Sequence, residues 1–234
     1  MTFWTEHPLL YTLLKQDSRR LVLHPYIRDT LEKLGCKRIF DYGCGDGSLF
    51  DDWKIDLEEV CLFDTSEFML DKAKEKYGER KKFSIVKDVE SVPTNHFDGV
   101  VLSLVLMTIP SIREQQYIFQ QIKRIKTTSG TCIVAVTHPC FHNYEFSTFK
   151  TEFVNGRSFE YLNQGQPYSV ELTDKSKNVI VDFKDYHWPL ATMINLIVSA
   201  GISIRKAVEL NDKEIIEGNG FNPNFPPYLV FHCE

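Results

Sequence analysis

The sequence predicts an α/β fold: a doubly wound sheet of seven strands, mostly parallel with an antiparallel final strand. Short apolar runs alternate with amphipathic helical stretches from residue 39 to residue 137, the pattern of strand-helix-strand units. The run 97–106 is almost entirely apolar, as expected of a central strand covered on both faces. With 234 residues, 43% of them hydrophobic, we expect a single domain over 1–234 that carries a lid.

The chain before the first strand predicts two helices. One lies near 8–15 and the other runs from Pro25 to Leu34, with Gly35 as its stop signal. The basic pair Arg19–Arg20 between them favours a solvated turn over the alternative of a functional site.

The stretch 39–50, IFDYGCGDGSLF, predicts a buried strand that passes through a tight turn into a helix. An acid, Asp41, is followed by three glycines at alternate positions: Gly43, Gly45 and Gly47. Glycine takes positive φ and lets another molecule approach the backbone, so a ligand site is favoured over an ordinary glycine-rich turn. The dinucleotide fingerprint G-x-G-x-x-G requires a glycine at position 48, which is Ser48, so a nicotinamide cofactor is the weaker alternative.

The pattern acid-x-Gly-x-Gly-x-Gly, matched in full by Asp41 and the three glycines, resembles motif I of the class I S-adenosylmethionine (SAM)-dependent methyltransferases. This resemblance implies a Rossmann-like fold, SAM as cofactor and S-adenosylhomocysteine as product. The chemistry agrees, because SAM has no pyrophosphate to place at a helix N-terminus. A carboxylate at Asp41 suits the ammonium and sulfonium groups of SAM and would repel a phosphate.

A second predicted strand, 59–63, ends at Asp64, which lies 21 residues beyond Gly43. An acid at this distance sits at the carboxyl end of the neighbouring strand, where its two oxygens can accept from the ribose hydroxyls. The alternative role is an N-cap for the helix 66–77, which Ser66 can supply by itself. We therefore interpret Asp64 as the ribose-binding residue.

The resemblance also implies further contacts with the cofactor. Residues 1–34 would fold over it as an N-terminal helical lid, with Tyr11 reaching the methionine carboxylate. Asp88, after a third strand at 83–87, would face the adenine amino group, and Ser103 would offer its carbonyl to the ammonium. The complete expected set is Tyr11, Asp41, Gly43, Cys44, Gly45, Gly47, Asp64, Thr65, Asp88, Val89 and Ser103.

The strand-helix alternation ends after a helix at 112–126 and a fifth strand at 131–137. Residues 138–186 are rich in aromatic side chains and predict an inserted antiparallel β lid, with a hairpin at Asn155–Gly156. Two more extended runs, 168–172 and 179–183, surround a polar turn. A helix at 189–200 and two closing strands at 202–210 and 228–233 follow.

Two histidines are candidates for a general base. His138 directly follows the fifth strand and His187 precedes the last helix, and the unperturbed pKa of histidine, about 6.5, suits proton removal at neutral pH. The alternatives are that each caps a turn ahead of a proline, or that no base is needed. A metal site using His138 and His142 is disfavoured, because Pro139 prevents a helix and no C-x-x-C or H-E-x-x-H accompanies them. We expect no metal.

The segments 137–141 and 186–190 resemble bacterial small-molecule methyltransferases near the ubiquinone and menaquinone biosynthesis group. Those proteins often carry Arg where this chain has Trp188, and the exchange favours an aromatic acceptor that stacks. The resemblance implies methyl transfer to the oxygen, nitrogen or carbon of a small aromatic or heteroaromatic metabolite. A SAM-binding sensor or partner subunit without turnover is the alternative.

Composition narrows the partners. The net charge of −5 supplies no positive field for nucleic acid, and no apolar run reaches the ~18 residues that span a membrane. The six cysteines form no C-x-x-C pair, which fits a reducing compartment. We expect a cytoplasmic monomer or homodimer.

Overall fold

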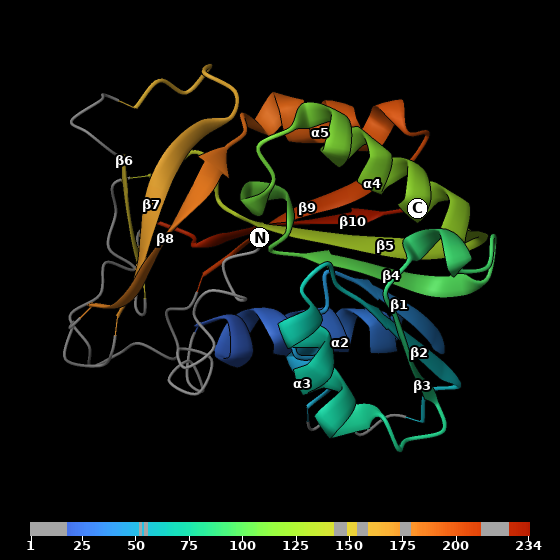
Figure 1. Ribbon diagram of the computed structural model, residues 1–234. Coiled ribbons are helices and arrows are strands. Elements are labelled where there is room, and N and C mark those ends of the chain that lie inside the picture. The colour runs from blue at the N-terminus through green and yellow to red at the C-terminus, as the bar shows by residue number, and fades with distance from the viewer. Residues whose placement is uncertain are drawn as a thin grey trace.

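The computed structural model describes residues 18–51, 53, 56–142, 149–153, 159–173, 179–211 and 225–234. Its main feature is a seven-stranded sheet with the order β3-β2-β1-β4-β5-β10-β9 (Figure 1). The strands are β1 Arg38–Tyr42, β2 Glu59–Phe63, β3 Phe83–Val86, β4 Phe97–Ser103, β5 Lys126–Thr137, β9 Ile204–Leu210 and β10 Tyr228–Cys233. The pairs among β1 to β5 are parallel, and β10 is antiparallel to both β5 and β9. The predicted sheet, with its antiparallel final strand, is confirmed.

Helices cover both faces of the sheet, as a doubly wound fold requires. They are α2 His24–Lys33, α3 Glu67–Tyr77, α4 Ile112–Ile125 and α5 Leu190–Ser199. The buried side chains of α4 and α5 belong to one apolar cluster and those of α2 and α3 to another, and Figure 1 shows the two pairs on opposite sides of the sheet. Along β1, Phe40 packs into the first cluster and Ile39 into the second, because successive side chains of a strand point to opposite faces.

Local signals explain where the helices begin. Ser66 accepts from the backbone N–H of Met69 and caps α3, and Ser111 accepts from that of Glu114 and caps α4. The expected helix after the glycine turn is wrong, however: only a 3-10 turn, Ser48–Phe50, follows it. This turn ends because Asp51 adopts extended backbone angles.

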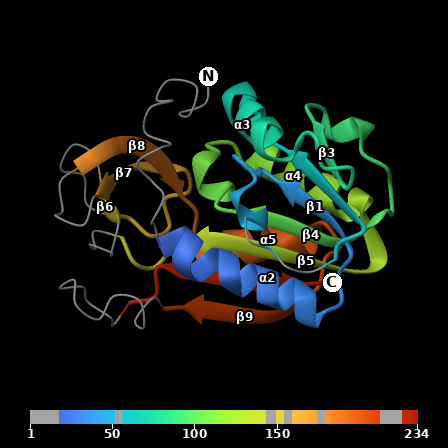
Figure 2. The ribbon, with the colours of Figure 1, turned by 90° about the horizontal axis from the view of Figure 1, so that it is seen from below.

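A separate antiparallel sheet contains β6 Phe149–Phe153, β7 Gln166–Thr173 and β8 Val179–His187, in the order β6-β7-β8. Figure 2 shows it beyond the ends of β4 and β5. The hydroxyl of Thr137, the last residue of β5, lies 3.4 Å from that of Tyr168 in β7, which places this sheet at the carboxyl edge of the main one. The predicted inserted β structure is confirmed, whereas the hairpin at Asn155–Gly156 and the helix at 8–15 lie outside the described residues.

No helix in the described ranges is long and apolar enough to cross a membrane.

Candidate functional site

A cavity of about 710 Å³ lies between the carboxyl edge of the main sheet and the three-stranded sheet. The loops after β1, β2 and β4 line it on one side, and β7 and β8 line it on the other. The carboxyl edge of an open α/β sheet is where ligands bind in this class of fold, and the volume lies within the range of small-molecule sites.

The three glycines of the loop after β1 serve different purposes. All have positive φ, at +81° for Gly43, +55° for Gly45 and +74° for Gly47. A Cβ on Gly43 would overlap the Val105 side chain, and one on Gly47 would lie 2.8 Å from the ring of Tyr77. A Cβ on Gly45 would meet nothing within 4 Å, and Gly45 lines the cavity. The outer glycines therefore permit close packing within the protein, and the middle one leaves space for a ligand.

Two acids meet beside this loop. Asp41 is the second-last residue of β1 and is 3% exposed, and burial together with the nearby Asp64 raises its pKa to about 8. Asp64 follows β2 and accepts from the backbone N–H groups of Gly45 at 2.9 Å and Ser66 at 2.8 Å. Burial raises the pKa of Asp64 although these hydrogen bonds oppose the shift. No ion pair joins either carboxylate to another residue of the described chain, so this corner of the cavity favours a cation or hydroxyl donors and disfavours a phosphate.

The other expected cofactor residues divide into two groups. Cys44, Thr65, Val89 and Ser103 line the cavity. Gly47 and Asp88 do not, and Asp88 instead caps the 3-10 turn Val89–Ser91 by accepting from the backbone N–H of Glu90. Tyr11 lies outside the described residues.

The chain turns sharply at the end of β4. Leu104 has a φ of +58°, an uncommon angle for a residue other than glycine, and strain of this kind is concentrated at functional sites. The buried Ser103 Oγ beside it has no hydrogen-bond partner in the described chain, although it lines the cavity.

The expectation that Arg19–Arg20 forms a solvated turn is wrong. Both residues lie in a π-helical turn, Arg19–Leu23, that leads into α2, and both line the cavity. Arg20 Nη2 lies 3.2 Å from Asp46 Oδ2, and Lys76 Nζ lies 2.5 Å from the same oxygen. Because Asp46 sits inside the glycine motif and is 2% exposed, these cations fix the loop from the outside. The position of Asp46 within the motif is the sequence signal for this role.

The structure does not bring the two candidate bases to the cavity. His138 Nε2 lies 3.0 Å from Glu209 Oε1, and its Nδ1 accepts from the backbone N–H of Cys140. His187 Nε2 donates to the Tyr161 carbonyl at 2.8 Å. Neither histidine is among the residues that line the cavity, and burial lowers the pKa of both.

The second ring nitrogen of His187 is also engaged. Since Nε2 carries the proton donated to Tyr161, Nδ1 must accept, and the donor is His142 Nε2 at 3.0 Å. The two rings form a neutral pair that packs against the three-stranded sheet, and burial lowers the pKa of His142 to about 3. No group of three or more His, Cys, Asp or Glu side chains in the described part of the chain could hold a metal.

Trp188 does not line the cavity either. It is buried, and its indole N–H donates to the Ile109 carbonyl at 3.2 Å. The aromatic surface that faces the cavity comes from other residues, which sequence reasoning missed: Phe149, Phe183, Tyr186 and Tyr228.

One acid interrupts this aromatic wall. Asp185 of β8 is 5% exposed and lines the cavity, and burial raises its pKa to about 7. It lies opposite Tyr168 in the pairing of β7 with β8, and Phe183 lies opposite Val170, so all four side chains point to one face. The sequence signal that could have identified Asp185 was a carboxylate on the strand face that otherwise carries apolar side chains.

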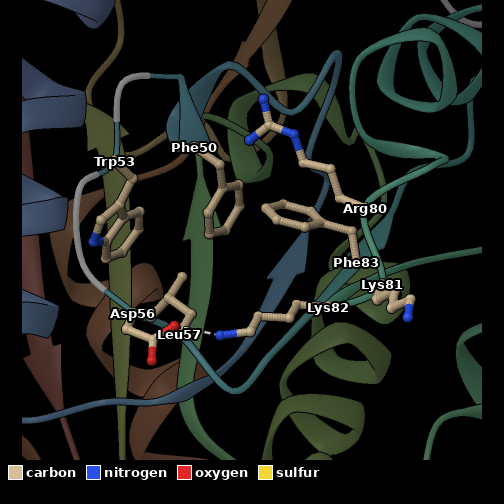
Figure 3. Close-up of a pocket in the computed structure, with 8 residues that line it drawn as sticks. All are labelled: Phe50, Trp53, Asp56, Leu57, Arg80, Lys81, Lys82 and Phe83. Atoms are coloured by element: carbon tan, nitrogen blue, oxygen red, sulfur yellow. Dashed lines mark hydrogen bonds and ion pairs between the residues drawn. The ribbon is translucent and has the colours of Figure 1, made fainter.

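A second cavity, of about 230 Å³, is lined by Phe50, Trp53, Asp56, Leu57, Arg80, Lys81, Lys82 and Phe83. Figure 3 shows the Phe50 and Phe83 rings pointing toward each other and an ion pair between Lys82 and Asp56. It shares no lining residue with the larger cavity and contains none of the expected site residues. The larger cavity is therefore the candidate site.

Comparison with known proteins agrees with this geometry. Residues 40–134 match the family model described as a methyltransferase domain. No curated protein matches the chain by sequence.

Similar folds occur in solved structures. A SAM-dependent methyltransferase from Mesorhizobium loti is 22% identical with a TM-score of 0.63, over 89% of this chain and 95% of its own. One from Clostridium acetobutylicum is 14% identical with a TM-score of 0.63, over 99% and 98%. The CcbJ methyltransferase from Streptomyces caelestis is 16% identical with a TM-score of 0.61, over 90% and 89%. Residues 40–134 thus match a methyltransferase domain, the fold of the chain is that of SAM-dependent methyltransferases, and SAM is the expected cofactor.

Proposed function

We propose that the protein binds SAM along the loops after β1, β2 and β4 and transfers its methyl group to a small aromatic or heteroaromatic acceptor. The observation that carries the proposal is the pair of acids, the buried Asp41 and the partly buried Asp64, beside the open space at Gly45. SAM carries an ammonium, a sulfonium and two ribose hydroxyls, which are the cations and hydroxyl donors that these two carboxylates can bind.

Each expected cofactor residue that the structure describes has a proposed role that fits its position. Each oxygen of Asp64 accepts one backbone N–H and retains a lone pair for a ribose hydroxyl. Asp41 supplies negative charge for the cationic end, together with the polar atoms of Ser103. Cys44, Thr65 and Val89 contribute contact surface, and Asp88 and Gly47 act indirectly by holding the adjoining turns. Tyr11 stays the proposed contact for the methionine carboxylate.

When bound, SAM supplies a methyl carbon that its sulfonium activates for in-line displacement. The protein must hold the nucleophile in line and exclude water, and such positioning is worth about 7–11 kcal/mol. The aromatic wall of the cavity is suited to this work, because flat rings orient an aromatic acceptor and keep the enclosure dry. We further propose a small-molecule acceptor and a cytoplasmic enzyme that acts as a monomer or homodimer.

Calorimetry with SAM, S-adenosylhomocysteine and NAD tests the cofactor assignment. We expect micromolar binding of the first two and none of NAD, and an Asp41→Asn variant should weaken SAM. NAD binding without SAM binding would overturn the proposal. Incubation with SAM and a metabolite library, followed by mass spectrometry for the mass gain of a single added methyl group, separates an enzyme from a SAM-binding protein without turnover.

A further inference from the structure

Asp185 occupies a different part of the cavity from the cofactor acids. Its strand neighbour Tyr168 lies against Thr137 at the end of β5, whereas Asp41 lies next to the end of β1 and Asp64 follows β2. In the sheet order, β4 separates β1 from β5, so these strand ends are about 10 Å apart at the usual spacing of about 4.8 Å. Asp185 therefore belongs to the half of the cavity that is left for the acceptor.

The carboxylate of Asp185 is incompletely satisfied by the protein. Its Oδ1 is buried and has no hydrogen-bond partner in the described ranges, and no cation pairs with it there. The neighbouring hydroxyls are already engaged, since Tyr168 contacts Thr137 and Tyr228 contacts Ser18 at 2.6 Å. Burying an acceptor without a partner is costly, and since Asp185 lines the cavity, a donor on a bound ligand would stabilise its carboxylate.

The surroundings limit what that ligand can be. Val170 and Phe183 lie on the same face of the sheet as Asp185, and Phe149 and Tyr186 also line the cavity. Aromatic faces attract cations and a carboxylate repels anions, so a carboxylate-bearing or phosphorylated group is disfavoured at this position. An apolar or aromatic molecule with one amine nitrogen matches both features.

Resting on the proposed function, we propose that the methyl acceptor is an amine and that Asp185 binds its nitrogen and takes its proton. An ammonium acceptor gives one proton to the Asp185 carboxylate and becomes a neutral amine. Its lone pair then forms the N–C bond while the C–S bond breaks, and the bonding electron pair stays on sulfur. The products are a methylated ammonium and S-adenosylhomocysteine, and the carboxylic acid returns its proton to solvent when the products leave.

Matched probes test the proposal: 2-phenylethylamine, 2-phenylethanol and 3-phenylpropionate. Their binding is measured by calorimetry with and without S-adenosylhomocysteine, and methylation of each is followed by mass spectrometry with SAM. We expect the amine to bind at least tenfold tighter than the alcohol and the carboxylate to bind most weakly. Equal binding of amine and alcohol, or tightest binding of the carboxylate, would overturn the proposal.

Two variants separate recognition from general damage. Asp185→Asn should abolish the preference for the amine and lower its methylation at least tenfold, while S-adenosylhomocysteine affinity stays within twofold. Asp182→Asn removes an exposed carboxylate from the same strand and should change neither the preference for the amine nor its methylation. A preserved amine preference in folded Asp185→Asn would contradict the proposal. Failure of the wild type to bind SAM would contradict the proposed function instead. Because amine binding is also measured without cofactor, this failure can be distinguished from a failure of the proposal for Asp185.

Discussion

The backbone N–H of Gly45 donates to Asp64 Oδ2 at 2.9 Å, so the middle glycine of the loop after β1 positions the acid that follows β2. A second bond, from the Ser66 N–H to Oδ1, fixes the other carboxylate oxygen. The carboxylate is thereby held at the edge of the cavity before any ligand arrives. Preorganisation of this kind reduces the entropy lost on binding.

Gly45→Val is expected to abolish SAM binding, because the new side chain would occupy the open space in which the cofactor is proposed to lie. The positive φ adds a local strain of about 1–2 kcal/mol, which should lower the melting temperature without unfolding the protein. Calorimetry and thermal melting measure the two effects. Gly47→Val is the matched comparison: its side chain would collide with Tyr77, so stability should suffer more. Undiminished SAM affinity in folded Gly45→Val would contradict the placement of the cofactor.

Asp64→Ala is expected to weaken SAM at least tenfold, or about 1.4 kcal/mol, through the loss of hydrogen bonds to ribose. Ser66→Ala is the control, since Ser66 caps α3 and its loss should cost about 1 kcal/mol of stability while leaving SAM affinity unchanged. If Asp64 serves only the local turn, its variant will behave like Ser66→Ala.

The cofactor half of the site could be predicted because its information is local. Asp41 lies next to the end of one short strand and Asp64 directly follows the next, and parallel strands bring their carboxyl ends to one edge whatever the rest of the chain does. The glycine spacing requires no tertiary contact to be recognised.

The acceptor half could not be predicted in the same way. Which side chains of β8 face the cavity depends on its pairing with β7, and a shift of one residue would turn Asp185 away. His187 is only two residues from Asp185 in the sequence, yet its ring contacts His142 and the Tyr161 carbonyl and does not line the cavity. The contact of Arg20 with Asp46 likewise joins segments whose approach no local pattern indicates.

His138→Ala and His187→Ala are expected to lower stability rather than turnover. Each ring is buried with both nitrogens engaged. His187→Ala leaves the buried His142 without its partner, at a cost of about 1–3 kcal/mol, whereas the partners of His138 are exposed, so His138→Ala acts mainly through lost packing. Melting temperature should fall in both, with kcat per folded enzyme within threefold of the wild type. A loss of about 10² in kcat at unchanged stability would restore the general-base hypothesis.

The last prediction concerns the charge of Asp41. Because burial and Asp64 raise its folded pKa to about 8, the unfolded chain ionises first as pH rises from about 4, and the free energy of unfolding falls until about pH 8. Asp41→Asn removes this penalty. The cofactor-free variant should therefore be more stable than the wild type at pH 8, by up to about 1.4 kcal/mol for each pH unit above pH 4, with a smaller difference at pH 5 and none near pH 4.

The same substitution should weaken SAM at least tenfold at pH 8, because the ionised carboxylate is then lost as a partner for the cationic end of the cofactor. Chemical denaturation across pH 4–9 and calorimetry at pH 8 measure the two effects. Asp51→Asn, which alters a partly exposed acid near the loop, is the control and should not reproduce the pH-dependent gain in stability. A variant that gains stability and keeps full SAM affinity would show that the buried charge is not used for the cofactor. One that loses stability at pH 8 would show that Asp41 is ionised and already compensated in the free protein.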